Sequence, residues 1–265
     1  MKRGFSLVEL SIVLVILGLL TGGILAGQSL IRAAELRSVS TDLNRYVAAT
    51  YTFRDKYMAA PGDMPNATAF WGAAAGDGTG NDTACHAVEG AGTATCNGNG
   101  DGKVYWAITS ANGTPREYFT FWKHLANAGL IEGKFTGISG SGSSNNPVTG
   151  INTPQLRLQQ AAIRLGHTQL PIPEGHASSY AGYYGFNWAM GRPVGTADDL
   201  DPIFLPEEVW NIDMKMDDGN PATGRITVMK PAAMPGCALG NDASTARYDL
   251  TTKTQACRFT LSNVI

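Results

Sequence analysis

The chain opens with a long apolar segment that has no polar face. Apolar residues dominate from Phe5 to Gly27, directly after the short basic leader 1–4, and Glu9 is the single charged residue in this stretch. At a helical rise of about 1.5 Å per residue the segment spans roughly 35 Å, which exceeds the hydrocarbon core of a bilayer at about 30 Å. The pattern therefore predicts a single membrane-spanning helix over 5–27.

After Gly27 the pattern becomes amphipathic through to 57. The positions that share one helical face, spaced by three and four, are Leu36, Val39, Leu43, Tyr46, Val47, Thr50, Phe53 and Tyr57. Arg37, Asp42 and Arg45 fall on the opposite side, which we expect to be exposed, and Pro61 ends the pattern. Together the two segments predict one helix over 5–57, roughly 80 Å long.

The remaining residues, 58–265, predict one globular head domain. A helix is expected from Pro115 to Ala128, where apolar residues at helical spacing precede a glycine. Strands are expected at 180–188 and 224–229, and residues 247–250 with 257–261 are expected to form a hairpin. Short strands without long helices between them favour an antiparallel sheet packed on the amphipathic half of the first helix, which is an α+β fold.

Composition excludes one class of function. Charged residues make up 16% of the chain, the net charge is −2, and no cluster of Lys and Arg occurs. Such a chain has no basic surface with which to attract nucleic acid.

Glu9 conflicts with a simple membrane span. A carboxylate near the bilayer centre costs about 2.5 kcal/mol or more, so a buried acid needs a partner. If the chain were cut between Gly4 and Phe5, the new α-amino group of Phe5 would lie one helical turn from Glu9, in the same chain or in a neighbouring copy. That pairing would offset both charges.

These residues resemble a known processing site. Lys2-Arg3-Gly4 followed by Phe5-Ser6-Leu7-Val8-Glu9-Leu10 is similar to the site of type IV pilins and type II secretion pseudopilins. The resemblance, which covers about the first 30 residues, implies that a prepilin peptidase cleaves after Gly4 and methylates Phe5. It also implies that Glu9 steers each subunit into a helical filament, either a homo-oligomer or an assembly of related pilins, on an inner-membrane assembly platform. An ordinary signal peptide or signal anchor is the alternative, but it explains neither Gly4 nor Glu9.

Four glycines, Gly18, Gly22, Gly23 and Gly27, interrupt the apolar helix. Each lowers helix stability by about 1 kcal/mol relative to alanine, so they mark a segment that can melt on assembly. Gly18 with Gly22, and Gly23 with Gly27, also fit the small-xxx-small spacing of closely packed helices. Both interpretations remain open.

The cysteines form two local pairs, Cys85 with Cys96 and Cys237 with Cys257. In an oxidising compartment each pair can close a short loop, and each bridge would add roughly 3 kcal/mol of stability. Buried free thiols and, less favoured, a zinc site are the alternatives. The second pair also resembles the closing loop near the C-terminus of many pilins.

A glycine-rich surface loop contains a calcium candidate. Asn97, Asn99 and Asp101 place oxygen-bearing side chains at alternate positions, with Gly102 sixth, as in the first half of an EF-hand loop. The twelfth position is Ile108, where that loop has a bidentate glutamate. Calcium is therefore a candidate cofactor, and a polar turn without metal is the alternative.

The sequence contains no phosphate-binding glycine loop and no His-Glu-x-x-His. Together with the resemblance of the N-terminal residues, this implies a structural subunit, a major or minor pilin of a type IV pilus-like extracellular filament, and not an enzyme. It would be a single-pass inner-membrane precursor before assembly into an extracellular or periplasmic filament. A type II secretion pseudopilin is the nearest alternative, and a membrane-tethered enzyme or binding protein is the second.

Overall fold

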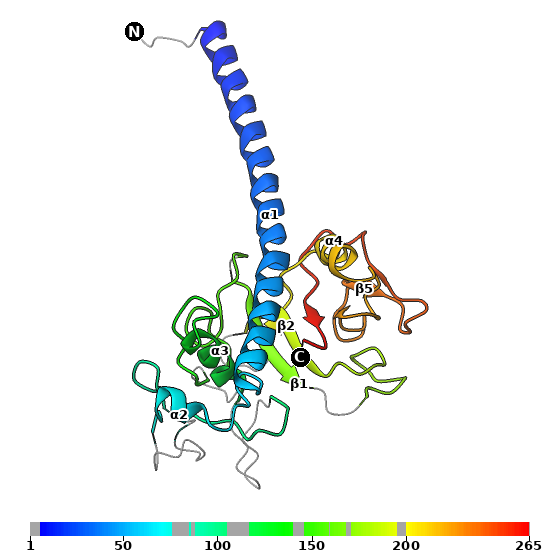
Figure 1. The fold of residues 1–265 in the computed structure, drawn as a ribbon. Coiled ribbons are helices and arrows are strands. Elements are labelled where there is room, and N and C mark those ends of the chain that lie inside the picture. The colour runs from blue at the N-terminus through cyan, green and yellow to red at the C-terminus, as the bar shows by residue number, and fades with distance from the viewer. Residues whose placement is uncertain are drawn as a thin grey trace.

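The computed structural model describes residues 6–75, 85, 88–104, 117–139, 146–158, 160–167, 171–194 and 200–264. Helix α1, Leu7–Tyr57, extends from the head as a stalk, and the head surrounds its C-terminal half (Figure 1). Ser6 caps the first turn, and Met58 closes the last turn in the left-handed conformation at φ 54°. The prediction of one helix over 5–57 is confirmed for the residues described.

The head contains three further helices and seven strands in its described residues. The helices are α2 (Ala67–Trp71), α3 (Glu117–Asn127) and α4 (Pro206–Met216). The strands are β1 (Ala162–His167), β2 (Phe186–Pro193), β3 (Leu200–Asp201), β4 (Ile226–Thr227), β5 (Ala238–Leu239), β6 (Arg247–Tyr248) and β7 (Phe259–Leu261). Figure 1 shows α2 and α3 on one side of α1, with α4 and β5 on the other.

The main sheet is antiparallel, with the order β1-β2-β7-β4, and β3 pairs with the end of β2. A second, two-stranded sheet joins β5 to β6. Side chains alternate across the main sheet because successive residues of a strand point to opposite faces. The inner face, which enters the core, is apolar and consists of Ile163, Leu165, Trp188, Met190, Ile226, Phe259 and Leu261.

One hydrophobic core joins α1, α3, α4 and the inner face of the sheet. From α1, Val39, Leu43 and Phe53 are fully buried. Tyr46 of α1 contacts Trp122 of α3 edge to face with ring centroids 5.4 Å apart, and Trp122 lies 5.7 Å from Trp188 of β2. The amphipathic half of α1 is thus the central element of the head, and the predicted α+β class is confirmed.

Two predictions, one about the head and one about α1, are wrong. Residues 247–250 and 257–261 do not pair as a hairpin, because β6 pairs with β5 while β7 pairs with β2 and β4. Asp42 is not exposed: only 4% of its surface is accessible, and its Oδ2 lies 3.5 Å from the backbone N–H of Arg157. A segment of the head covers this side of α1, which the periodicity of α1 alone could not reveal.

Candidate functional site

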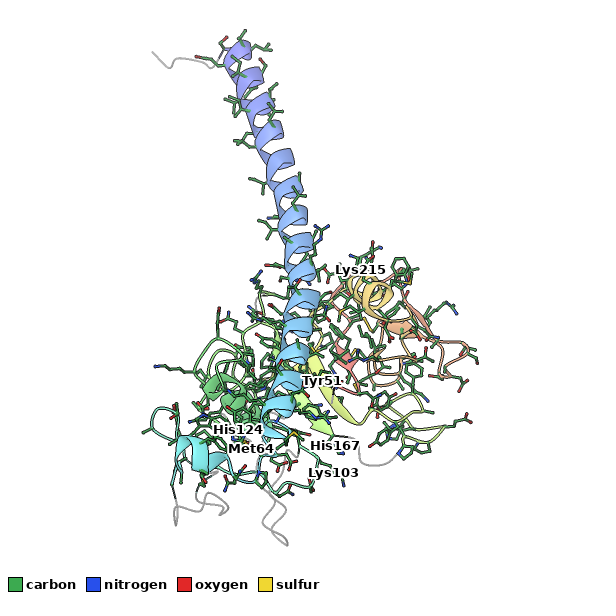
Figure 2. All side chains as sticks on the ribbon, in the orientation of Figure 1. Tyr51, Met64, Lys103, His124, His167 and Lys215 are labelled. Carbon is green, nitrogen blue, oxygen red and sulfur yellow. A yellow bond between two sulfur atoms is a disulfide. The ribbon has the colours of Figure 1, made fainter. Side chains whose placement is uncertain are left out.

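The N-terminal half of α1 forms a long exposed apolar surface. Its large apolar side chains from Leu7 to Ile24 are each 50–85% accessible to solvent. Figure 2 shows side chains projecting from this stalk, which the described part of the head does not cover. In the described residues, α1 is the one helix that is long and apolar enough to cross a membrane. An apolar surface of this extent marks a contact with lipid or with other protein chains.

Glu9 lies in the first turn of α1 and forms a capping box with Ser6. Its Oε2 accepts the backbone N–H of Ser6 at 2.8 Å, and Ser6 Oγ accepts the N–H of Val8 at 3.4 Å. A carboxylate at a helix N-terminus is favoured by the helix dipole. The side chain of Glu9 therefore turns toward the amino end, where the predicted cleavage would create a positive charge. Gly4 and Phe5 lie outside the described residues, so that pairing stays a prediction.

The four glycines of the apolar segment do not interrupt α1, which is helical throughout Leu7–Tyr57. A Cβ atom built on Gly18, Gly22, Gly23 or Gly27 would meet nothing within 4 Å. No contact within the described chain therefore requires glycine at these positions. Their role, by melting or by close packing, concerns the assembled state and stays a prediction.

An ion pair between α1 and α4 marks the place where the stalk enters the head. Arg32 Nε donates to Glu208 Oε1 at 2.6 Å, and its second terminal nitrogen, Nη2, donates to Glu208 Oε2 at 2.8 Å and to the carbonyl of Ile203 at 3.1 Å. Glu208 Oε2 also accepts the N–H of Leu205, which closes the first turn of α4. The carboxylate raises the pKa of Arg32 further above its usual value. This clamp fixes α4 to the stalk.

Sequence reasoning did not identify Arg32 or Glu208. Arg32 is the first charged residue after Glu9, so it is the first side chain beyond the apolar segment that can form an ion pair. Pro206 at the first position of α4 and Glu208 at the third are signals for a helix start. Those signals could have identified α4, which was not predicted, but they do not identify its partner in α1.

Both predicted disulfides are present. Cys85 and Cys96 are bonded across 11 residues, and Cys237 and Cys257 across 20 residues, with Cα atoms 5.8 Å and 4.9 Å apart. All four cysteines are therefore in disulfides, and the alternative of buried free thiols is wrong.

The loop that carries the calcium candidates surrounds a carboxylate. Asp63 accepts the backbone N–H groups of Gly100, Asp101 and Gly102 at 2.7–3.1 Å. Burial raises the pKa of Asp63 to about 6, although these N–H groups oppose the shift. Asp63 therefore anchors the loop to the turn that follows α1.

The three candidate oxygens for calcium each accept a backbone N–H. Asn97 Oδ1 accepts from Thr68, Asn99 Oδ1 from Asp101, and Asp101 Oδ1 from Lys103. These bonds order the loop as a series of polar turns. Calcium binding by Asn97, Asn99 and Asp101 stays a prediction.

His124 of α3 has a structural environment. The side chain is fully buried (labelled in Figure 2), and its Nδ1 accepts the N–H of Gly62 at 3.0 Å. Its Nε2 lies 3.1 Å from both Thr95 Oγ1 and the carbonyl of Cys96. The imidazole thus ties the turn after α1 to the first disulfide loop and has a structural role in the core.

Comparison with known proteins identifies the N-terminal segment. Residues 1–25 match the family described as the prokaryotic N-terminal methylation motif. No curated protein and no solved structure matches the chain. The motif is the prepilin signal of type IV pilins and pseudopilins, so the resemblance predicted from residues 2–10 is confirmed. The pilin-type proteins that carry this signal are structural, and the signal together with the apolar helix indicates a membrane-anchored precursor.

Proposed function

We propose that the chain is a structural subunit, a major or minor pilin, of a type IV pilus-like extracellular filament. The observation that carries the proposal is a prepilin signal at the start of an apolar helix that the chain's own head leaves uncovered. From Leu7 to Ile31 this part of α1 is about 37 Å long, which matches either a bilayer core or the core of a helical bundle.

The proposed pathway uses the same apolar surface twice. In the precursor the exposed half of α1 spans the inner membrane and the head lies outside the cytoplasm. Prepilin peptidase cleaves after Gly4 and methylates Phe5, and the helix then moves from lipid into a bundle of related helices. Because a helix bundle is as apolar as lipid, the hydrophobic effect contributes little to this step. Close packing, the pairing of Glu9 and the assembly platform instead drive the transfer of the helix from lipid into the bundle.

Glu9 provides the test. In the bundle the carboxylate of Glu9 would pair with the α-amino group of a neighbouring Phe5, and Glu9→Ala would leave that amine buried without a partner. We expect Glu9→Ala to be processed and to accumulate in the membrane, but to be absent from the filament fraction sheared from the cell surface. Glu132→Ala, which removes an exposed acid of the head, is the matched control and should be incorporated as the wild type is.

The sheared fraction also separates the two filament systems that share this signal. A pilin is recovered there, whereas a subunit of the type II secretion machinery stays in the cell envelope. Normal incorporation of Glu9→Ala would contradict the proposed assembly mechanism, and a wild-type chain confined to the envelope would favour the pseudopilin alternative. A tethered enzyme or binding protein would keep its activity without Glu9.

A further inference from the structure

The outer face of the main sheet, opposite to the core, carries a row of polar and small side chains. Arg164 of β1 lies opposite Ala189 of β2, Ala189 lies opposite Thr260 of β7, and Thr260 lies opposite Thr227 of β4. Residues in register on adjacent strands share a face with Cβ atoms about 5 Å apart. The small side chain of Ala189 thus leaves a depression between Arg164 and the two threonines.

The segment that precedes β2 forms a wall around this depression. Ile172 and Gly182 exchange backbone hydrogen bonds at 2.7 Å and 3.0 Å, and Ser179 forms an isolated antiparallel β-bridge with Met229. The hollow is partly open to solvent and has a volume of about 160 Å³. We call it the outer-face pocket, and its lining consists of Arg164, Ile172, Ser179, Tyr184, Asn187, Ala189, Thr227, Val228, Met229, Arg258 and Thr260.

The lining of the outer-face pocket is positively charged. It contains two guanidinium groups, of Arg164 and Arg258, and no carboxylate among these residues. Arg258 is held in place, because one terminal nitrogen donates to the carbonyl of Leu200 at 2.6 Å and the other lies 2.8 Å from the Sδ atom of Met229. Preorganised arginines recognise carboxylate and phosphate groups through paired N–H donors.

Hydroxyl and amide groups complete the chemistry of the outer-face pocket. Ser179, Thr227 and Thr260 supply hydroxyl groups, and Asn187 supplies an amide. Groups that both donate and accept hydrogen bonds match the hydroxyl groups of a sugar. The volume is below the roughly 300–1,000 Å³ of pockets that enclose drug-sized ligands, so it suits one monosaccharide unit rather than an oligosaccharide.

We propose that the outer-face pocket binds a monosaccharide unit that carries a carboxylate or a phosphate group. Arg164 and Arg258 bind the anionic group, and the threonine, serine and asparagine side chains bind the ring hydroxyls. The pocket opens on the face of the sheet opposite to the core that holds α1. The inference does not rest on filament assembly, since binding is measured on the unassembled chain.

The test titrates four probes into the full-length chain in a non-ionic detergent at low ionic strength. The probes are sodium glucuronate, glucose 6-phosphate, inorganic phosphate and glucose, and binding is followed by calorimetry. We expect saturable binding of glucuronate or glucose 6-phosphate, the stronger of the two identifying the anionic group, and much weaker binding of neutral glucose. Arg164→Gln should weaken that binding about tenfold or more, because it removes a charge-assisted contact.

Ala189→Leu and Arg192→Gln separate a specific pocket from general attraction to positive charge. Ala189→Leu fills the floor of the pocket without changing its charge, so it should also weaken binding by about tenfold. Arg192 lies on β2 as well, but it is exposed and pairs with Asp201 outside the pocket, so Arg192→Gln should bind as the wild type does. Circular dichroism verifies that each variant is folded.

Three results would overturn the proposal. The first is the absence of saturable binding by both anionic sugars. The second is binding of inorganic phosphate without either sugar, which would indicate a site for a simple anion. The third is binding that Arg164→Gln and Ala189→Leu leave unchanged, which would place the ligand elsewhere.

Discussion

Neutralising Glu208 tests whether the clamp between α1 and α4 stabilises the head. Glu208→Gln keeps the shape of the side chain and an oxygen that can accept the N–H of Leu205. It removes the charge that receives two hydrogen bonds from Arg32, at 2.6 Å and 2.8 Å. Arg32 would then keep the hydrogen bond to the carbonyl of Ile203 at 3.1 Å and a longer ion pair with Glu35 at 3.6 Å.

The magnitude follows from the burial of the two side chains. Breaking a fully buried ion pair costs about 3–5 kcal/mol, whereas an exposed pair contributes about 0–1 kcal/mol. The side chain of Glu208 is 9% exposed and that of Arg32 is 29% exposed, so this pair lies between the two limits. We expect Glu208→Gln to lower the free energy of unfolding by about 2–3 kcal/mol, which corresponds to a melting temperature roughly 5–10 °C lower.

The assay is thermal unfolding of the full-length chain in detergent, followed by near-ultraviolet circular dichroism. The matched control is Glu207→Gln on the adjacent residue, whose pair with Lys253 is more than half exposed on both sides and should contribute less than about 0.5 kcal/mol. Arg32→Met and the double variant complete the cycle, with an expected coupling energy of about 2 kcal/mol. Equal melting temperatures for Glu208→Gln and Glu207→Gln would refute the reasoning.

Four further predictions concern other parts of the chain. Burial raises the pKa of Asp213 to about 6, so the folded state retains a proton that the unfolded chain releases near pH 4. The free energy of unfolding should therefore fall as the pH rises from about 4 to 6, and denaturant titrations of Asp213→Asn should show a smaller fall. An unchanged pH dependence in this variant would count against the assignment to Asp213. Replacing Cys237 and Cys257 together by alanine should cost about 3 kcal/mol, and an unaltered melting temperature would contradict this. Gly22→Ala should still assemble, because an added methyl group meets open space in the single chain. Gly22→Ile should not assemble, because the larger side chain blocks close packing between helices. Loss of filaments in Gly22→Ala would favour melting of the helix instead. Calcium chloride should raise the melting temperature of the wild type but not of Asp101→Ala, and a calorimetric titration without heat would remove the metal site.

Local patterns in the sequence predicted the helices that carry strong periodicity. The predicted bounds 5–57 and 115–128 compare with Leu7–Tyr57 and Glu117–Asn127 in the described residues. The stop after Tyr57 and the two disulfides also follow from local signals, since Pro61 limits the helix and the paired cysteines lie close in sequence. For the candidate site, Glu9 could be identified because a charge in an apolar span is unusual.

The pairing of short strands and the polar contacts between distant segments could not be predicted. β7 pairs with β2 and β4 rather than with its neighbour in sequence, and strands of two or three residues contain too little pattern to fix a partner. Arg32 and Glu208 are 176 residues apart, and Asp42 is buried by the segment around Arg157. Each of these contacts depends on how the head folds around α1, which periodicity along one helix does not encode.

The processed state of the chain tests the central proposal most directly. Intact mass and N-terminal sequencing of the protein recovered from sheared cell-surface filaments should show a chain that begins at N-methylated Phe5. An unprocessed chain that begins at Met1, or one cleaved behind the apolar segment as an ordinary signal peptide is, would contradict the account.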